Sequence, residues 1–173
     1  MLLEREGISY WAEPSGIEEL TEGFDPPELV LANACAKAQA VAERRLDADA
    51  VLGVDTLVAL GTRVFGQPAD AADAKATLTA LSGKTHQVHS GVCLIINGSQ
   101  RTGIETTAVR FQSLSDQQIG QYVATDEWRG RAGGYAIQSG GQRLVESVIG
   151  DLDNVIGLPL DLLLKLAPEL AIN

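Results

Sequence analysis

The sequence predicts an α/β domain with a mixed β-sheet, and three observations support this fold class. The chain has 173 residues, of which 45% are hydrophobic and 21% are charged, as in one packed globular domain. Hydrophobic patterns of helical type and of strand type alternate along the chain. The segments between them are of both crossover and hairpin type, so we expect parallel and antiparallel strands in one sheet.

The first 27 residues carry the weakest patterns. Residues 1–7 resemble the last turns of a helix that Gly7 ends, and residues 8–11 have the composition of a strand. Residues 12–27 contain three prolines among acidic and small residues, which is typical of a surface loop. We expect its acidic pair, Glu18 and Glu19, to face a cleft.

A helix and a strand follow with clear patterns. Apolar residues recur at helical spacing over residues 28–45, which predicts a helix. Residues 50–60 form a nearly continuous apolar run of strand length, and its only charged residue is Asp55. A turn at residues 61–63 then leads into a short return strand over residues 64–66.

The middle of the chain predicts a helix and a hairpin. Asp70 is a suitable N-cap for a helix that ends at Gly83. Residues 86–96 alternate in strand fashion, the Asn-Gly pair at 97–98 favours a hairpin turn, and residues 106–111 alternate again.

The last third predicts two helices and a strand. Ser115 and Gln118 have the spacing of a capping box, which opens a helix. A glycine-rich stretch over residues 130–141 precedes a strand over residues 144–149. A leucine-rich helix is expected from about Leu160 onward.

The net charge argues against one broad class of function. There are 13 Lys and Arg residues against 23 Asp and Glu residues, which gives a net charge of −10. Such a surface repels nucleic acids and anionic lipids, so we expect neither a nucleic-acid polymer nor a membrane as partner. An anionic substrate such as a phosphate ester would need a divalent cation or a local basic cluster.

Targeting signals and cysteines indicate the cytoplasm. No apolar run is long enough to span a bilayer, and the first residues lack the hydrophobic segment of a signal peptide. Cys35 and Cys93 are far apart and show no C-x-x-C spacing, which argues against a zinc site and a disulfide scaffold. We expect both to be buried free thiols in a reducing compartment.

Asp55 is the most informative residue of the sequence. A carboxylate inside a buried strand costs several kcal/mol unless it is paired, bound to a metal or placed at a cleft. A structural role, in which Asp55 accepts backbone N–H bonds at a bulge, is an equally good interpretation from this residue alone. Thr56 would point to the opposite face of an ideal strand.

Other candidate residues give weaker signals. The pair Gly133 and Gly134 would let the backbone approach a ligand, but a tight loop with Tyr135 in the core explains it as well. His86 and His89 would face opposite sides of one strand and cannot chelate one metal, so we expect them at the surface or at the rim of a cleft. Neither a nucleophile elbow nor a Walker loop is present.

Four motifs in order give a more specific prediction. They are Gly-Val-Asp-Thr-Leu-Val at 53–58, Leu-Ser-Gly-x-x-His-x-Val-x-Ser-Gly-Val at 81–92, Arg-Ala-Gly-Gly-Tyr-Ala-Ile-Gln at 131–138 and Asn-Val-Ile-Gly-Leu-Pro-Leu at 154–160. Together they resemble the Maf family of nucleoside triphosphate pyrophosphatases, also called septum-formation proteins, and in particular its pyrimidine-selective dTTP/UTP branch. The resemblance covers essentially the whole chain. It implies a fold similar to inosine triphosphate pyrophosphatases, with an elongated mixed sheet and flanking helices in two lobes around a nucleotide cleft.

The resemblance also implies roles for individual residues. Asp55 matches the family's catalytic aspartate, which would accept a proton from the attacking water or help to hold a metal ion. Thr56 and Gln138 match the positions associated with reading the base of dTTP and UTP, and a hydroxyl and a carboxamide can each donate and accept hydrogen bonds there. Lys37 matches a lysine expected to contact phosphate, and Glu19 matches a loop glutamate expected to coordinate the metal.

Three features depart from the family pattern. The family begins with a strand and an S-x-R-R loop that grips the triphosphate, and this chain starts just after that place, so we expect residues 1–173 to be a single, N-terminally truncated Maf-like domain. Gln67 stands where the family usually has lysine, which removes a cation from the phosphate site. Arg131 replaces another lysine, but it keeps the charge and offers a fork suited to phosphate.

The resemblance therefore predicts a hydrolase that acts on acid anhydrides. It would convert a nucleoside triphosphate, preferably dTTP or UTP, to the monophosphate and diphosphate with Mg²⁺ or Mn²⁺. A homodimer is the assembly that the resemblance suggests. The alternative is a catalytically impaired nucleotide-binding or regulatory relative, which the absent S-x-R-R loop and Gln67 would explain.

Overall fold

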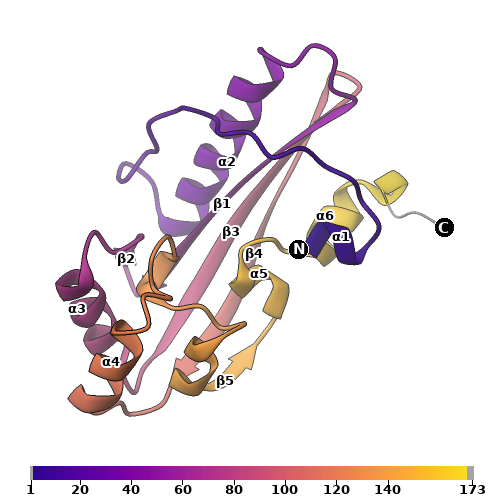
Figure 1. Ribbon diagram of the computed structural model, residues 1–173. Helices are drawn as coiled ribbons and strands as arrows, with labels where there is room; N and C mark the ends of the chain where they lie inside the picture. Colours follow the sequence, from indigo (N-terminus) through magenta and orange to yellow (C-terminus); the bar gives the residue numbers. More distant parts are fainter. Residues whose placement is uncertain (1, 171–173) are drawn as a thin grey trace. The chain divides into compact units, whose positions relative to one another are not determined.

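A computed structural model describes residues 2–170, and it is an α/β fold built on one five-stranded sheet (Figure 1). The strands are β1 (Ala50–Leu60), β2 (Arg63–Phe65), β3 (Thr85–Ile96), β4 (Ser99–Phe111) and β5 (Val145–Ile149). The α-helices are α1 (Leu2–Arg5), α2 (Pro26–Ala42), α3 (Ala71–Leu81), α4 (Asp116–Val123), α5 (Leu152–Ile156) and α6 (Leu160–Leu166). Short 3₁₀ turns are η1 (Ala132–Gly134), η2 (Gly140–Leu144) and η3 (Pro168–Leu170).

The sheet has the order β2-β1-β3-β4-β5, and its three central strands are 11 to 13 residues long. The α/β class with flanking helices is confirmed, but the sheet is antiparallel. The parallel pairs expected in a mixed sheet are not found among the described strands. The physical reason is that tight turns and short helical connections return the chain at the end of the strand it has just left, which produces antiparallel neighbours.

Most of the predicted elements are confirmed. Asp70 caps α3 by accepting a hydrogen bond from the Asp73 N–H, and Ser115 forms the expected capping box with Gln118. The hairpin turn at 97–98 has positive φ at both residues, as its Asn-Gly sequence requires. The strand after this turn is longer than expected, because it begins directly at Ser99.

Two further expectations are wrong. Residues 8–11 form no strand, and Trp11 is 83% exposed; a strand composition produces a strand only where a neighbouring strand supplies hydrogen bonds. His86 and His89 are buried rather than at a surface or rim, because both lie on the central strand β3.

Between residues 2 and 170, no helix combines the length and the apolar composition of a membrane span.

The chain divides into two compact units, in agreement with the two expected lobes. The first unit contains the described residues up to Thr56, Ser90–Glu105 and the described residues from Gly157 on. The second contains Leu57–His89 and Thr106–Ile156.

In the first unit, α2 lies very close to β1 and β3. Asp25 caps this helix by accepting a hydrogen bond from the Glu28 N–H, and two prolines occupy its first positions. A Cβ atom at Gly53 would clash with the Ala34 carbonyl oxygen, and one at Gly91 would clash with the helix backbone at Val30. The two glycines therefore allow the helix to lie directly on the strands, next to the middle of β1.

Two apolar clusters complete the cores. In the first unit, α6 packs on β3 through Val92, Leu94, Ile96, Leu160, Leu163 and Ala167. In the second unit, α3, α4 and the strands enclose a larger cluster around Phe111 and Trp128, which are 0% and 1% exposed. Burial of these apolar surfaces is the main stabilising contribution in each unit.

Candidate active site

Asp55 lies buried in the middle of β1, with 9% of its surface exposed, and both of its carboxylate oxygens have partners. Oδ1 accepts a hydrogen bond from Lys37 Nζ at 2.6 Å, and Oδ2 accepts one from Asn33 Nδ2 at 3.1 Å. Both partners come from α2, one helical turn apart and on the same face of the helix. The structure thus supplies a cation and an amide for the charge that the sequence left unexplained.

Lys37 joins two carboxylates. Its ammonium nitrogen lies 2.6 Å from Glu19 Oε1 and 2.6 Å from Asp55 Oδ1. Burial by itself would lower the pKa of Lys37, but hydrogen bonds to Asp55 and Glu19 outweigh it, and the pKa is raised above its usual value. Lys37 is therefore a cation at neutral pH, placed between an exposed carboxylate and a buried one.

Asn33 is a member of this cluster that the sequence analysis missed. It is 3% exposed, and its amide binds both the backbone of Leu20 and the carboxylate of Asp55. The available signal was its position four residues before Lys37, which places both side chains on one face of the helix.

The residues present fit a divalent metal ion in part. Two carboxylates, Glu19 and Asp55, converge on one cationic position, which the Lys37 ammonium occupies. Mg²⁺ prefers oxygen ligands and is commonly held by one or two carboxylates together with substrate phosphates. Among the residues that the structure describes, no group of three or more His, Cys, Asp or Glu side chains could hold a metal by itself.

Thr56 follows Asp55 on β1 and is half-buried. Its hydroxyl lies 2.7 Å from the hydroxyl of Ser90, a fully buried residue at the point where β3 enters the first unit. This contact gives the Thr56 hydroxyl a hydrogen-bond partner on the neighbouring strand β3.

Arg131 and Gln138 belong to the second unit, where they lie on both sides of the two-glycine turn. Gly133 adopts a φ of 69°, donates its N–H to Gly66 O at 3.0 Å and leaves no room for a Cβ, which would lie 2.7 Å from Val58. Tyr135 is in the core, at 5% exposure, as expected for a tight loop. Both Arg131 and Gln138 are exposed.

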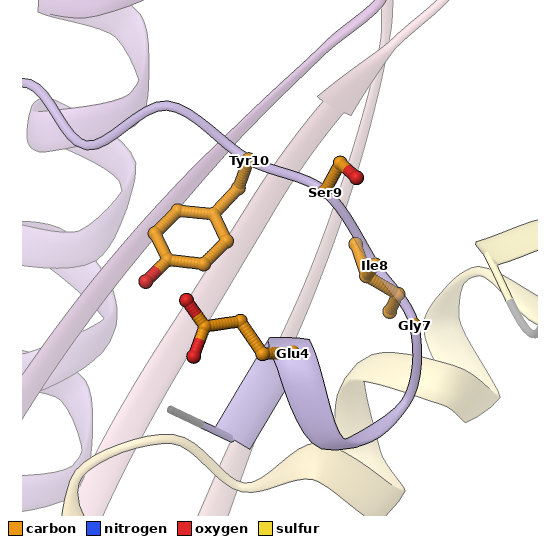
Figure 2. A pocket seen from close by; sticks show the side chains of 5 residues that line it. All are labelled: Glu4, Gly7, Ile8, Ser9 and Tyr10. Carbon is orange, nitrogen blue, oxygen red and sulfur yellow. The ribbon is translucent and has the colours of Figure 1, made fainter.

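The structure therefore brings Glu19, Lys37 and Asp55 together, and Thr56 is the residue that follows Asp55 on β1. A separate surface hollow of about 430 Å³ is lined by Glu4, Gly7, Ile8, Ser9 and Tyr10 (Figure 2). None of the predicted site residues is among those that line it. The chemistry of the first unit is concentrated at the middle of β1 instead.

The chain resembles known proteins over nearly its whole length. Residues 1–170 match the family described as Maf-like protein. A protein of Desulfitobacterium hafniense named dTTP/UTP pyrophosphatase is 44% identical over 168 residues, which cover 93% of this chain and 76% of that protein.

Two further relatives carry the same name. The Pyrococcus furiosus protein is 42% identical over 154 residues, with 88% of this chain and 80% of that protein covered. The Deinococcus radiodurans protein is 41% identical over 165 residues, with 95% and 84% covered. The chain therefore belongs to the Maf-like protein family.

Proposed function

We propose that the protein is a nucleoside triphosphate pyrophosphatase that acts on dTTP and UTP and releases diphosphate and the nucleoside monophosphate. The observation that carries this proposal is the buried Asp55 carboxylate, which contacts an ammonium group and an amide in a strand without any other charged residue. Relatives at 41 to 44% identity are named dTTP/UTP pyrophosphatase, which supports the same activity.

Asp55 is the proposed proton acceptor for the attacking water. A carboxylate held by donors on both oxygens keeps a fixed orientation, and a positioned general base contributes about 10²- to 10⁴-fold to a rate. Lys37 can move from the carboxylates to a phosphate oxygen, because its long side chain carries the charge at a flexible end. Glu19 and Asp55 would hold Mg²⁺ or Mn²⁺, which when bound neutralises phosphate charge and polarises the α-phosphorus.

Thr56 and Gln138 are the proposed readers of the pyrimidine base. A carboxamide donates and accepts at once, so Gln138 can pair with both the N–H and a carbonyl of an imide. Arg131 is the proposed second phosphate contact, since its guanidinium offers parallel donors.

We further propose that the two units function as one domain over residues 1–173, in a cytoplasmic homodimer. The sequence has two cysteines, Cys35 and Cys93, and no disulfide framework, which favours a reducing compartment. Light scattering on the purified chain measures the assembly: a mass of twice the chain supports the dimer, and a mass of one chain contradicts it.

The function is tested by measuring diphosphate release from a panel of nucleoside triphosphates with Mg²⁺, with Mn²⁺ and with excess chelator. We expect turnover of UTP and dTTP above that of purine nucleotides, and loss of turnover with chelator. Nucleotide binding without diphosphate release would contradict the proposal and favour the impaired relative, for which Gln67 in place of lysine is the specific observation.

A further inference from the structure

We propose that Asn33 is a positioning residue, which holds the loop that carries Glu19 and the carboxylate of Asp55 in one fixed arrangement. The inference rests on the proposed pyrophosphatase function, because it assigns Asn33 a role in the same site. Lys37 joins the carboxylates of Glu19 and Asp55. Asn33 donates to the Asp55 carboxylate and binds the backbone of Leu20, the residue that follows Glu19.

The hydrogen-bonding capacity of the Asn33 amide is almost fully used. Its Oδ1 accepts from the Leu20 N–H at 2.8 Å, and its Nδ2 donates to Leu20 O at 3.0 Å and to Asp55 Oδ2 at 3.1 Å. An NH₂ group has two protons, and each has one acceptor here. The reversed amide would put an oxygen against the carboxylate and against the Leu20 carbonyl, so the contacts select one orientation.

The loop needs such a contact because it has little support of its own. Residues 12–21 contain neither helix nor strand, and the Leu20 side chain is 48% exposed. Near its start, Arg44 binds Glu13 and the carbonyls of Pro14 and Ser15, just beyond the end of α2. Asn33 binds the same loop at Leu20, directly after Glu19, from the middle of α2.

The two attachments have different consequences. The contact at Arg44 is exposed, whereas Asn33 is buried and also touches Asp55. The peptide that follows Glu19 is therefore connected to Asp55 through a single side chain. This ties the backbone next to Glu19 to the Asp55 carboxylate before a nucleotide or a cation binds, and such preorganisation is what a catalytic site requires.

Only an amide of this length meets all three contacts. An aspartate would face the Asp55 carboxylate with a second negative charge at about 3 Å, where like charges repel strongly. A leucine has a similar size but would leave one oxygen of Asp55 and both backbone groups of Leu20 without their partner.

The test compares Asn33→Leu and Asn33→Asp with Gln39→Glu. Gln39 is an exposed amide on the same helix, so Gln39→Glu adds the same charge as Asn33→Asp away from the site. We expect kcat for UTP to fall about 10- to 100-fold in both Asn33 variants, the usual cost of removing a hydrogen bond to a charged group, while KM changes less than about threefold. Gln39→Glu should behave as wild type; equal losses in all three variants would overturn the proposal.

A double-mutant cycle separates positioning from general damage. If Asn33 acts through Asp55, then Asn33→Leu should cost little further activity in an Asp55→Asn background. Fully additive losses would mean that Asn33 acts elsewhere, and would overturn the role. Melting curves of each variant identify any loss that comes from unfolding, and Asn33→Asp serves if Asn33→Leu does not fold.

A measurement without turnover distinguishes this proposal from the proposed function. Hydrogen exchange of the Leu20 amide, followed by NMR, should be at least about tenfold faster in Asn33→Leu than in wild type or Gln39→Glu. If wild type hydrolyses no nucleotide, the proposed function is wrong, while faster exchange still supports the attachment of the loop by Asn33. Unchanged exchange at Leu20 overturns the proposal whatever the activity.

Discussion

The two units each bury a polar side chain on a central strand, and they treat it in opposite ways. In the first unit, Asp55 on β1 has a cation and an amide donor as partners. In the second unit, His86 on β3 is 1% exposed and meets the Tyr135 hydroxyl at 2.9 Å and the edge of the Phe111 ring, with centroids 4.8 Å apart. The surroundings of Asp55 provide an opposite charge, whereas the Tyr135 and Phe111 contacts of His86 provide none.

The second environment favours neutral groups. Burial lowers the pKa of His86 to about 4, and burial also raises the pKa of Tyr135 above its usual value. His86 Nδ1 is buried without a hydrogen-bond partner in the described structure. A buried polar residue is therefore not by itself a sign of catalysis. A buried charge that has a cation and an amide donor as partners, such as Asp55, is the stronger sign.

The largest expected difference between the two residues is in turnover. Asp55→Asn should lower kcat at least about 10²-fold, because a carboxamide cannot accept the proton from water. His86→Leu should leave kcat within about threefold but destabilise the fold by about 1–3 kcal/mol, because the Tyr135 hydroxyl loses its partner in the core. Diphosphate release and urea unfolding on both variants measure the contrast, and comparable kcat losses would remove it.

Part of the pH dependence of the free energy of unfolding should come from the buried His86 in the second unit. Because the pKa of His86 is lowered to about 4 in the folded protein, the unfolded chain binds a proton at this residue below about pH 6.5, whereas the folded protein does not until about pH 4. This contribution to stability is complete above pH 6.5 and is lost as the pH falls through that window, by about 3 kcal/mol in total.

Unfolding of wild type and His86→Leu at pH 7, 6, 5 and 4 isolates this contribution from that of the carboxylates. The stability advantage of wild type over His86→Leu should fall by about 3 kcal/mol between pH 7 and pH 4, so that it disappears or changes sign. A constant difference would show that His86 becomes charged in the folded state as easily as in the unfolded state.

The stability of the cluster formed by Glu19, Lys37 and Asp55 should depend on having both the cation and the buried carboxylate present. Lys37→Met leaves two carboxylates without their shared cation; breaking a buried ion pair costs about 3–5 kcal/mol, and we expect about 2 kcal/mol because this Lys37 side chain is 20% exposed. In the Lys37→Met, Asp55→Asn double variant much of that loss should return, since the buried charge is then also absent. Chemical unfolding of the four proteins tests this, and additive losses would contradict the coupling.

The smallest expected effect is on base selection. Gln138→Glu removes the amide donor and adds a negative charge, which should reduce the preference for UTP and dTTP over purine nucleotides about three- to tenfold. Ratios of kcat/KM over a nucleotide panel give the measurement. An unchanged order of preference would place base recognition at other residues.

The sequence predicted those parts of the molecule that depend on local patterns. The helix predicted over residues 28–45 is observed at Pro26–Ala42, and the strand at Ala50–Leu60 and the caps at Asp70 and Ser115 lie where they were predicted. These features follow from periodicity and capping chemistry, which act over a few residues. The direction of the strands and the burial of His86 depend on which strand pairs with which. Composition and spacing carry little information about that pairing.

The same distinction holds for the candidate site: residues with a local signal or a family resemblance were predicted, and a residue defined by distant contacts was not. The buried carboxylate in an apolar run identified Asp55, and a resemblance to the Maf family supplied Lys37 and Glu19, which the structure places in contact. Asn33 was not predicted, because its partners, Leu20 and Asp55, are 13 and 22 residues away in the chain. The role of such a polar residue in a helix can be recognised only in the folded structure, where these partners lie in contact with it.

Hydrolysis of UTP in ¹⁸O-labelled water shows whether the charged cluster around Asp55 directs water to the α-phosphorus. We expect one labelled oxygen in the nucleoside monophosphate and none in the diphosphate, with the labelled product greatly reduced in Asp55→Asn. Label in the diphosphate, or labelled monophosphate formed at the wild-type rate by Asp55→Asn, would contradict it.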